Sequence, residues 1–210
     1  MKSVMNLFRR GSKSETVALR TDVESLRLEN AVLRREQEAL RERFHRLEAD
    51  QKLVLEALER LEVGLPPASL GALLLELTAR PFGLASFYLA LMDWDLDGLS
   101  FPYYYEGGRP RNHPGRKLSV APGLTGRVLL EGRSLYTRTL EEAEALGAIL
   151  TEAEKGSGLI PASWYGVPLG RSPRPWGVVA FMSFQRDAFP EDRRALLDAL
   201  VRVLELALRR

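Results

Sequence analysis

The sequence of 210 residues contains no cysteine. This absence excludes disulfides, thiolate nucleophiles, cysteine-ligated zinc and any chromophore held through a thioether bond. Several classes of enzyme therefore do not fit this chain, and we expect no catalytic residue of its own.

Groups of metal-binding residues are also missing. His45 and His113 are the only histidines, and neither lies near other candidate ligands. Asp93, Asp95 and Asp97 are closely spaced, but no bidentate glutamate follows them as in a calcium-binding EF-hand loop. The spacing is typical of a turn, and the sequence predicts no metal site.

Long apolar runs and an excess of one charge are lacking as well. No segment has the length of a transmembrane helix, and the first residues lack the apolar core of a signal peptide. The 30 basic and 28 acidic residues are interleaved along most of the chain. We therefore expect a cytoplasmic location and no nucleic-acid partner.

A seven-residue repeat is the clearest feature that is present, and it occupies residues 15–64. Every d position of the repeat is apolar, while the a positions are half polar and include Asn30. Leucine at d together with a buried asparagine at a favours a parallel, in-register dimer. The d residues, which with Asn30 are the predicted dimerisation residues, are Leu19, Leu26, Leu33, Leu40, Leu47, Val54 and Leu61.

Charged residues beside this repeat agree with a homodimer. In a parallel pair the g and e′ positions match in opposite charge, as for Glu29 with Arg34 and Glu36 with Arg41. Each exposed pair contributes only a few tenths of a kcal/mol, so the pairs indicate partner choice rather than strength. Residues 1–14 form a basic, flexible segment ahead of the repeat, which could also dock on a protein partner or an anionic membrane surface.

Gly64, Pro66 and Pro67 end the repeat and mark a boundary, so residues 65–210 form a separate domain. Its pattern of apolar runs and turns predicts an α+β fold with an antiparallel sheet flanked by helices. The predicted helices are 69–79, 124–130, 139–155 and 190–210, the predicted strands are 85–92, 99–105, 134–137, 163–169 and 176–184, and residues 107–117 form a surface loop.

Three segments of this domain resemble a GAF domain. They are Pro122 to Val128 with Glu131 to Arg133 behind it, Ser163 to Leu169, and Trp176 to Phe181 leading to the final helix. The resemblance covers residues 65–210 and implies a six-stranded antiparallel sheet with helices on both sides, a fold often used to sense small molecules. It does not identify a ligand or cofactor.

The resemblance also implies where a small-molecule ligand would lie, between the sheet and the helices and loops above it. The residues that this placement brings together are Phe101, Tyr103, Tyr105, Arg127, Trp164 and Phe181. Aromatic walls with one guanidinium would suit a base or an anionic metabolite, although the same aromatic residues could simply fill the core. The family's cyclic-nucleotide signature is absent, and so are the cysteines of its methionine sulfoxide reductases.

Two functions remain open on the sequence alone. One is a non-enzymatic, dimeric signalling protein in which ligand binding to the GAF-like domain is transmitted through the coiled coil. The alternative is a structural adaptor whose GAF-like domain binds no ligand and contacts other proteins. Both predict a protein partner.

Overall fold

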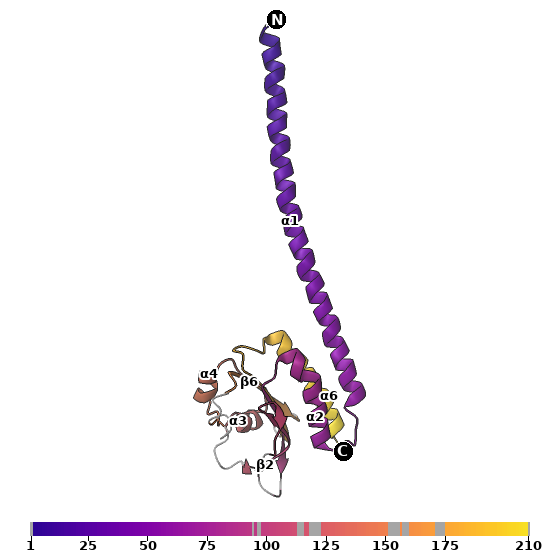
Figure 1. Ribbon diagram of the computed structural model, residues 1–210, viewed down its shortest axis with the longest axis vertical. Helices are drawn as coiled ribbons and strands as arrows, with labels where there is room; N and C mark the ends of the chain where they lie inside the picture. Colours follow the sequence, from indigo (N-terminus) through magenta and orange to yellow (C-terminus); the bar gives the residue numbers. More distant parts are fainter. Residues whose placement is uncertain are drawn as a thin grey trace. The chain divides into compact units, whose positions relative to one another are not determined.

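A computed structural model describes residues 2–93, 95, 98–112, 116–117, 123–150, 156, 160–170 and 175–209, with side chains from residue 23 onward except at 116 and 117. The chain divides into two compact units, Met1–Gln51 and Lys52–Arg210. Figure 1 shows the long helix and the α/β domain, each of which is described separately below.

The helix α1 spans Lys2–Arg60, and its backbone includes residues 2–14, for which the sequence predicts flexibility. Gly11 is the weakest helix former in that segment, but a single glycine costs only about 1 kcal/mol inside a helix. The helix ends before Gly64, whose φ of 96° is left-handed, and Pro67. The helix therefore ends close to where the sequence predicts, but the compact unit begins at Lys52 and includes residues 52–64, which the sequence analysis assigns to the repeat.

Seven antiparallel strands form the sheet in the described part of the domain. Six follow one another in the order β3-β2-β1-β7-β6-β5, and β4 pairs with β2 outside this path. The strands are β1 Ser86–Asp93, β2 Gly98–Glu106, β3 Arg109–Pro110, β4 Arg116–Lys117, β5 Leu135–Thr137, β6 Ser163–Leu169 and β7 Gly177–Ser183. The two short strands β3 and β4 fall within the predicted surface loop.

Helices cover both faces of this sheet, as Figure 1 shows. α2 (Pro67–Phe82) and α6 (Glu191–Leu208) lie on one face, and α3 (Gly123–Glu131) and α4 (Leu140–Ala145) on the other. Each face has its own apolar core, because successive strand residues point to opposite sides. We call them the helix-side core, which contains Phe87, Phe181 and Leu200, and the cavity-side core, which contains Tyr88 and Trp164.

The predicted helix over residues 139–155 is shorter in the structure. α4 ends at Ala145, because Gly147 adopts a left-handed φ of 86° and the Ala148 N–H bonds to the Ala143 carbonyl at 2.9 Å. Residues 151–155 of the prediction lie outside the described residues. The acidic first turn, with Glu141 and Glu142, agrees with the predicted helix start.

No helix in the described part of the chain combines the length and the apolar character needed to cross a membrane.

A buried carboxylate fixes the end of α6. The side chain of Glu205 is only 3% exposed, and it accepts hydrogen bonds from Arg202 and Arg209. Burial acts to raise the pKa of this carboxyl, but the two arginines and a backbone hydrogen bond from Gly170 together outweigh that effect and hold the pKa below its usual 4.5. The ionised form is therefore favoured by folding.

We expect Glu205→Gln to lower the free energy of unfolding at neutral pH by about 1–3 kcal/mol. A carboxyl whose pKa is depressed in the folded state contributes stability above its unfolded pKa and loses it as the pH falls below about 4.5. Urea unfolding at neutral pH and near pH 3 should show the difference between the two proteins shrinking in acid. A difference that stays constant with pH would contradict the pKa assignment.

Candidate functional site

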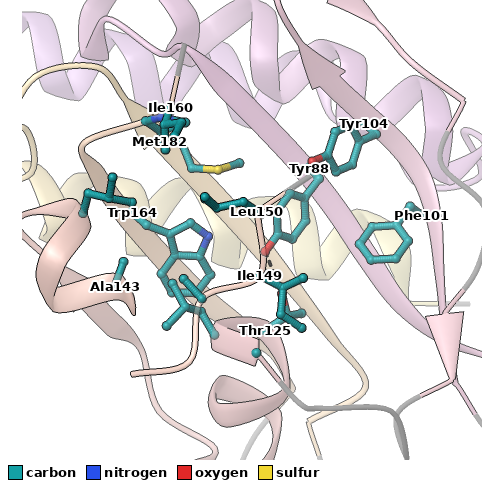
Figure 2. A pocket seen from close by; sticks show the side chains of 15 residues that line it. Tyr88, Phe101, Tyr104, Thr125, Ala143, Ile149, Leu150, Ile160, Trp164 and Met182 are labelled. Carbon is teal, nitrogen blue, oxygen red and sulfur yellow. Dashed lines mark hydrogen bonds between the residues drawn. The ribbon is translucent and has the colours of Figure 1, made fainter. Parts of the chain in front are cut away.

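A cavity of about 100 Å³ lies on the sheet face that α3 and α4 cover. Four strands contribute its floor, through Tyr88 on β1, Phe101 and Tyr104 on β2, Trp164 on β6 and Met182 on β7. The remaining walls come from the start of α3, from α4 and from the segments beside them (Figure 2). These other lining residues are Gly123, Leu124, Thr125, Leu140, Ala143, Ala148, Ile149, Leu150, Ile160 and Pro161.

A cluster of three aromatic rings forms one side of the cavity. Tyr88 stacks on Tyr104 at 5.5 Å between ring centres and meets Phe101 edge-on at 5.6 Å. The Tyr88 hydroxyl shares a buried hydrogen bond of 2.6 Å with the Thr125 hydroxyl, which ties β1 to the first turn of α3. This bond satisfies the only polar atom of the Tyr88 side chain.

Trp164 forms the opposite part of the lining, and Gly166 provides the space for its indole. A β-carbon at Gly166 would lie 2.1 Å from one ring carbon of Trp164 and 2.7 Å from another. The indole therefore lies along β6 directly over the glycine. Only hydrogen at position 166 permits this arrangement.

Gly166→Ala should accordingly displace the indole and lower the free energy of unfolding by about 1–3 kcal/mol, as overpacking does elsewhere. The emission of Trp164 should change as well, because the ring must leave its position in the cavity wall. Ala162→Gly, on the half-buried residue before β6, is a control for general loosening. Unchanged stability and emission in Gly166→Ala would show that the indole does not occupy this position.

Two of the six predicted ligand residues, Phe101 and Trp164, line the cavity. Tyr103, Tyr105 and Phe181 belong to the helix-side core instead, where Phe181 is fully buried and burial raises the pKa of the Tyr103 hydroxyl. The structure therefore does not bring the six side chains together around one cavity.

A bulge in β2 explains the error for the tyrosines. Tyr103 pairs with Leu89 while Ser100 pairs with Leu91, so β2 has one more residue than β1 between these pairs. Pro102 lies in this interval and cannot donate a ladder hydrogen bond, which is typical of a bulge. Beyond it the alternation reverses, and Tyr104 rather than Tyr103 shares the face of Phe101.

Arg127 does not line the cavity either. Its side chain is 39% exposed, and its Nε lies 3.4 Å from a carboxylate oxygen of Glu131, one turn further along α3. Contrary to the sequence prediction, Arg127 is therefore not placed to bind an anionic ligand in the cavity.

Thirteen of the fifteen described lining residues are not among the predicted ligand residues, and those of them with aromatic, hydroxyl or thioether groups are Tyr88, Tyr104, Thr125 and Met182. Pro102 was the signal for Tyr104, since a proline inside a strand indicates a bulge. Met182 is the direct partner of Trp164 in the pairing of β6 with β7. Because paired residues share a face of the sheet, the position of Trp164 indicates that Met182 also faces the cavity. No sequence pattern pointed to the bond between Tyr88 and Thr125.

The predicted dimerisation residues fall into three groups. Leu26, Leu33, Leu40 and Leu47 are between 55% and 66% exposed in the single chain, and the side chain of Leu19 lies outside the described residues. Asn30 is also exposed, and its amide donates to the Leu26 carbonyl at 2.9 Å. The third group consists of Val54 and Leu61.

Val54 and Leu61 pack against the α/β domain. Leu61 is only 5% exposed within the helix-side core, where Val54 is half-buried beside it. A heptad pattern requires burial but does not say against which surface, so Leu61 was wrongly placed in the dimer seam. The intramolecular contact accounts for its burial fully.

No group of three or more acidic or histidine side chains is placed to hold a metal ion within the described ranges.

Comparisons with known proteins agree with this architecture. A family model described as "GAF domain" matches residues 50–209. No curated protein matches the chain significantly.

Similar solved structures share the fold at low sequence identity. The GAF domain of an Acinetobacter phosphoenolpyruvate-protein phosphotransferase aligns with a TM-score of 0.61 at 17% identity, covering 78% of this chain and 92% of that one. The corresponding domain from Coxiella burnetii gives 0.62 at 13% identity, with coverages of 77% and 93%. A free methionine-R-sulfoxide reductase from Neisseria meningitidis, solved with its substrate, gives 0.59 at 16% identity, with coverages of 75% and 87%.

Proposed function

Because the chain belongs to the GAF domain family, we propose that it is a dimeric regulatory protein that senses a small molecule and transmits its binding through α1. The observation that carries this proposal is the cavity between the sheet and α3 and α4. It is bordered by side chains from four strands, so an occupant would contact most of the sheet at once.

The sheet itself offers a route from the cavity to the other face. Tyr88 lines the cavity, while its neighbours Phe87 and Leu89 on the same strand lie fully buried in the helix-side core. A shift of β1 would therefore alter the packing of α2 and α6. A ligand can drive such a shift only if it binds one of the two arrangements more tightly.

The last turns of α1 belong to this helix-side core. Ala57 is fully buried there with Leu61, and the Arg60 guanidinium bonds to Glu76 of α2 at 2.8 Å. Because α1 is one continuous helix from Lys2 to Arg60, a change in core packing acts directly on its C-terminal turns. This is the mechanical link that the proposal requires.

Exposed leucines on α1 support the dimeric part of the proposal. Leu26, Leu33, Leu40 and Leu47 repeat every seven residues and are all exposed in the single chain. Such a row is expected to be covered in solution, and the matched charges beside it fit a second copy of the same chain. The output then passes to a protein partner.

The proposed function involves no catalysis. Some proteins of this fold are methionine sulfoxide reductases, such as the Neisseria meningitidis protein. The resemblance assigns that reaction to cysteines, and this chain has none.

The small size of the cavity favours one alternative. Ligand pockets commonly measure about 300–1,000 Å³, whereas this cavity measures about 100 Å³. The chain could therefore be an adaptor whose GAF domain is closed by its own side chains and contacts other proteins.

Native mass spectrometry of protein purified gently from its own host separates these possibilities. We expect a dimer that carries one small molecule per chain, and the molecule should be released on denaturation. Ala143→Leu fills the cavity and should yield a ligand-free dimer, whereas Ala145→Leu, on the exposed side of the same helix, should retain the molecule. A ligand-free wild-type dimer would favour the adaptor, and a monomer would contradict the proposal.

A further inference from the structure

We propose that the cavity takes an uncharged, largely apolar molecule of about the size of benzene with one hydrogen-bond acceptor. This inference rests on the proposed function, because it names the ligand class of the same site. It differs from the anionic metabolite that the sequence suggests.

The charge of the lining is the first argument. None of the fifteen lining residues that the structure describes carries a charge, and most are aliphatic or aromatic. Arg127, the cation expected from the sequence, lies outside the cavity and is paired with Glu131. An ion would lose its hydration without gaining a partner, so a charged molecule should bind at least about 100-fold more weakly than a neutral one of equal shape.

The volume is the second argument. An apolar cavity of about 150 Å³ in another protein accepts benzene, and the present cavity has about 100 Å³. A nucleotide or a tetrapyrrole cannot enter unless the surrounding segments move. A single small ring or a short branched chain fits with only minor adjustment of the side chains.

The third argument concerns the indole of Trp164. This ring lines the cavity, and Figure 2 shows its nitrogen on the edge that points toward Tyr88 and Leu150. Within the described part of the chain its N–H group makes no hydrogen bond. This N–H is open to the cavity rather than sealed in the core, since Thr137 Oγ1 is the buried side-chain atom that lacks a partner among the described residues. An acceptor on the ligand would therefore reach it and form a hydrogen bond.

Two side-chain hydroxyls of the lining are engaged with each other. The hydroxyls of Tyr88 and Thr125 bond to each other at 2.6 Å, and Tyr104 also has an interaction of its own. Among the side-chain donors of the described lining, the Trp164 N–H is the one that makes no hydrogen bond, and we take it as the group that distinguishes one small molecule from another. We expect it to select acceptors, such as an amide oxygen or a ring nitrogen.

Two matched pairs of probes test this assignment on the full-length chain. Isobutyramide and isobutyrate have the same shape and differ in charge, while pyridine, uncharged at neutral pH, and benzene differ in the acceptor. Calorimetry should give dissociation constants between about 1 μM and 1 mM for isobutyramide and pyridine. Benzene should bind about 5- to 10-fold more weakly than pyridine, and isobutyrate at least about 100-fold more weakly than isobutyramide.

The indole N–H resonance of Trp164 provides a readout at the site itself. Pyridine should move this resonance downfield and benzene should not, and Trp164→Phe, which identifies the resonance, should remove the preference for pyridine. Ala143→Leu should abolish binding of all neutral probes, while Ala145→Leu should leave it unchanged. Ala143 is buried and Ala145 is exposed on the same helix α4, so the comparison shows whether a leucine added to this helix acts through the cavity.

Equal binding of isobutyramide and isobutyrate would overturn the ligand class while leaving a sensor possible. The proposed ligand class would also be overturned if no neutral probe bound, or if binding survived Ala143→Leu. If the probes bind as expected and the dimer does not respond to them, the ligand class stands and the proposed sensor function fails.

Discussion

Leu40→Glu is expected to convert the proposed dimer into a monomer. Leu40 is 66% exposed in the single chain and occupies a d position, so in the proposed dimer two copies of it face each other. The substitution removes two buried leucines and brings two like charges together, which should weaken the dimer by at least about 4 kcal/mol, or 1,000-fold. Sedimentation velocity over a range of concentrations measures the change.

Leu28→Glu is the matched control for this experiment. Leu28 is 70% exposed, lies on the same helix and has the same side chain, but it occupies an f position on the outer side of the repeat. It should leave the dimer intact. Equal effects of the two substitutions would contradict the predicted seam, and a dimer that survives Leu40→Glu would place the interface elsewhere.

Phe181→Ala should have the largest effect on folding. Phe181 is fully buried in the helix-side core and packs on Phe87 at 5.4 Å between ring centres. Its truncation should lower the free energy of unfolding by about 3–5 kcal/mol, a large part of the total stability of a typical domain. Chemical denaturation followed by circular dichroism measures this loss.

Phe184→Ala is the corresponding control just beyond the end of β7. Phe184 is 51% exposed, so its removal should change stability by less than about 0.5 kcal/mol. If Phe181 lined a ligand site, its truncation would reduce binding more than stability. A stable Phe181→Ala protein would therefore contradict its assignment to the core.

Much of the fold follows from local sequence patterns. The predicted limits of β6 are confirmed at Ser163 and Leu169, and the hairpin of β1 and β2 is confirmed to within a residue or two at each end. These elements are marked by continuous apolar runs between turn residues, a signal that depends little on the rest of the chain. The helix over 139–155 was too long because Gly147 ends it with a left-handed conformation.

The site was harder to predict than the fold, because it depends on which face of the sheet each side chain occupies. A single extra residue at Pro102 moves Tyr103 and Tyr105 away from the cavity and Tyr104 into it. Phe181 and Met182 are neighbours in sequence, yet only Met182 reaches the cavity. Strand identity can be read locally, whereas the register that assigns faces is set by pairing across the sheet.

Leu61 shows a similar limit for the helix. Its spacing fits the heptad as well as that of Leu40, but it is buried in the helix-side core of its own chain. One heptad pattern thus covers both the exposed row of leucines proposed to form the dimer and a residue of the domain core. The residue that would continue the predicted dimer seam instead lies in the domain core, directly after the end of α1.

Coupling between the cavity and α1 is the central claim, and the lack of native cysteine makes it directly measurable. A spin label at Glu38→Cys, an exposed outer position of α1, gives one distance per dimer. Double electron–electron resonance on protein purified gently from its own host, before and after the bound molecule is dialysed out, should show two different distance distributions. The same treatment of an Ala143→Leu background should show no change, whereas an identical distribution in the occupied and emptied wild-type dimer would contradict the account.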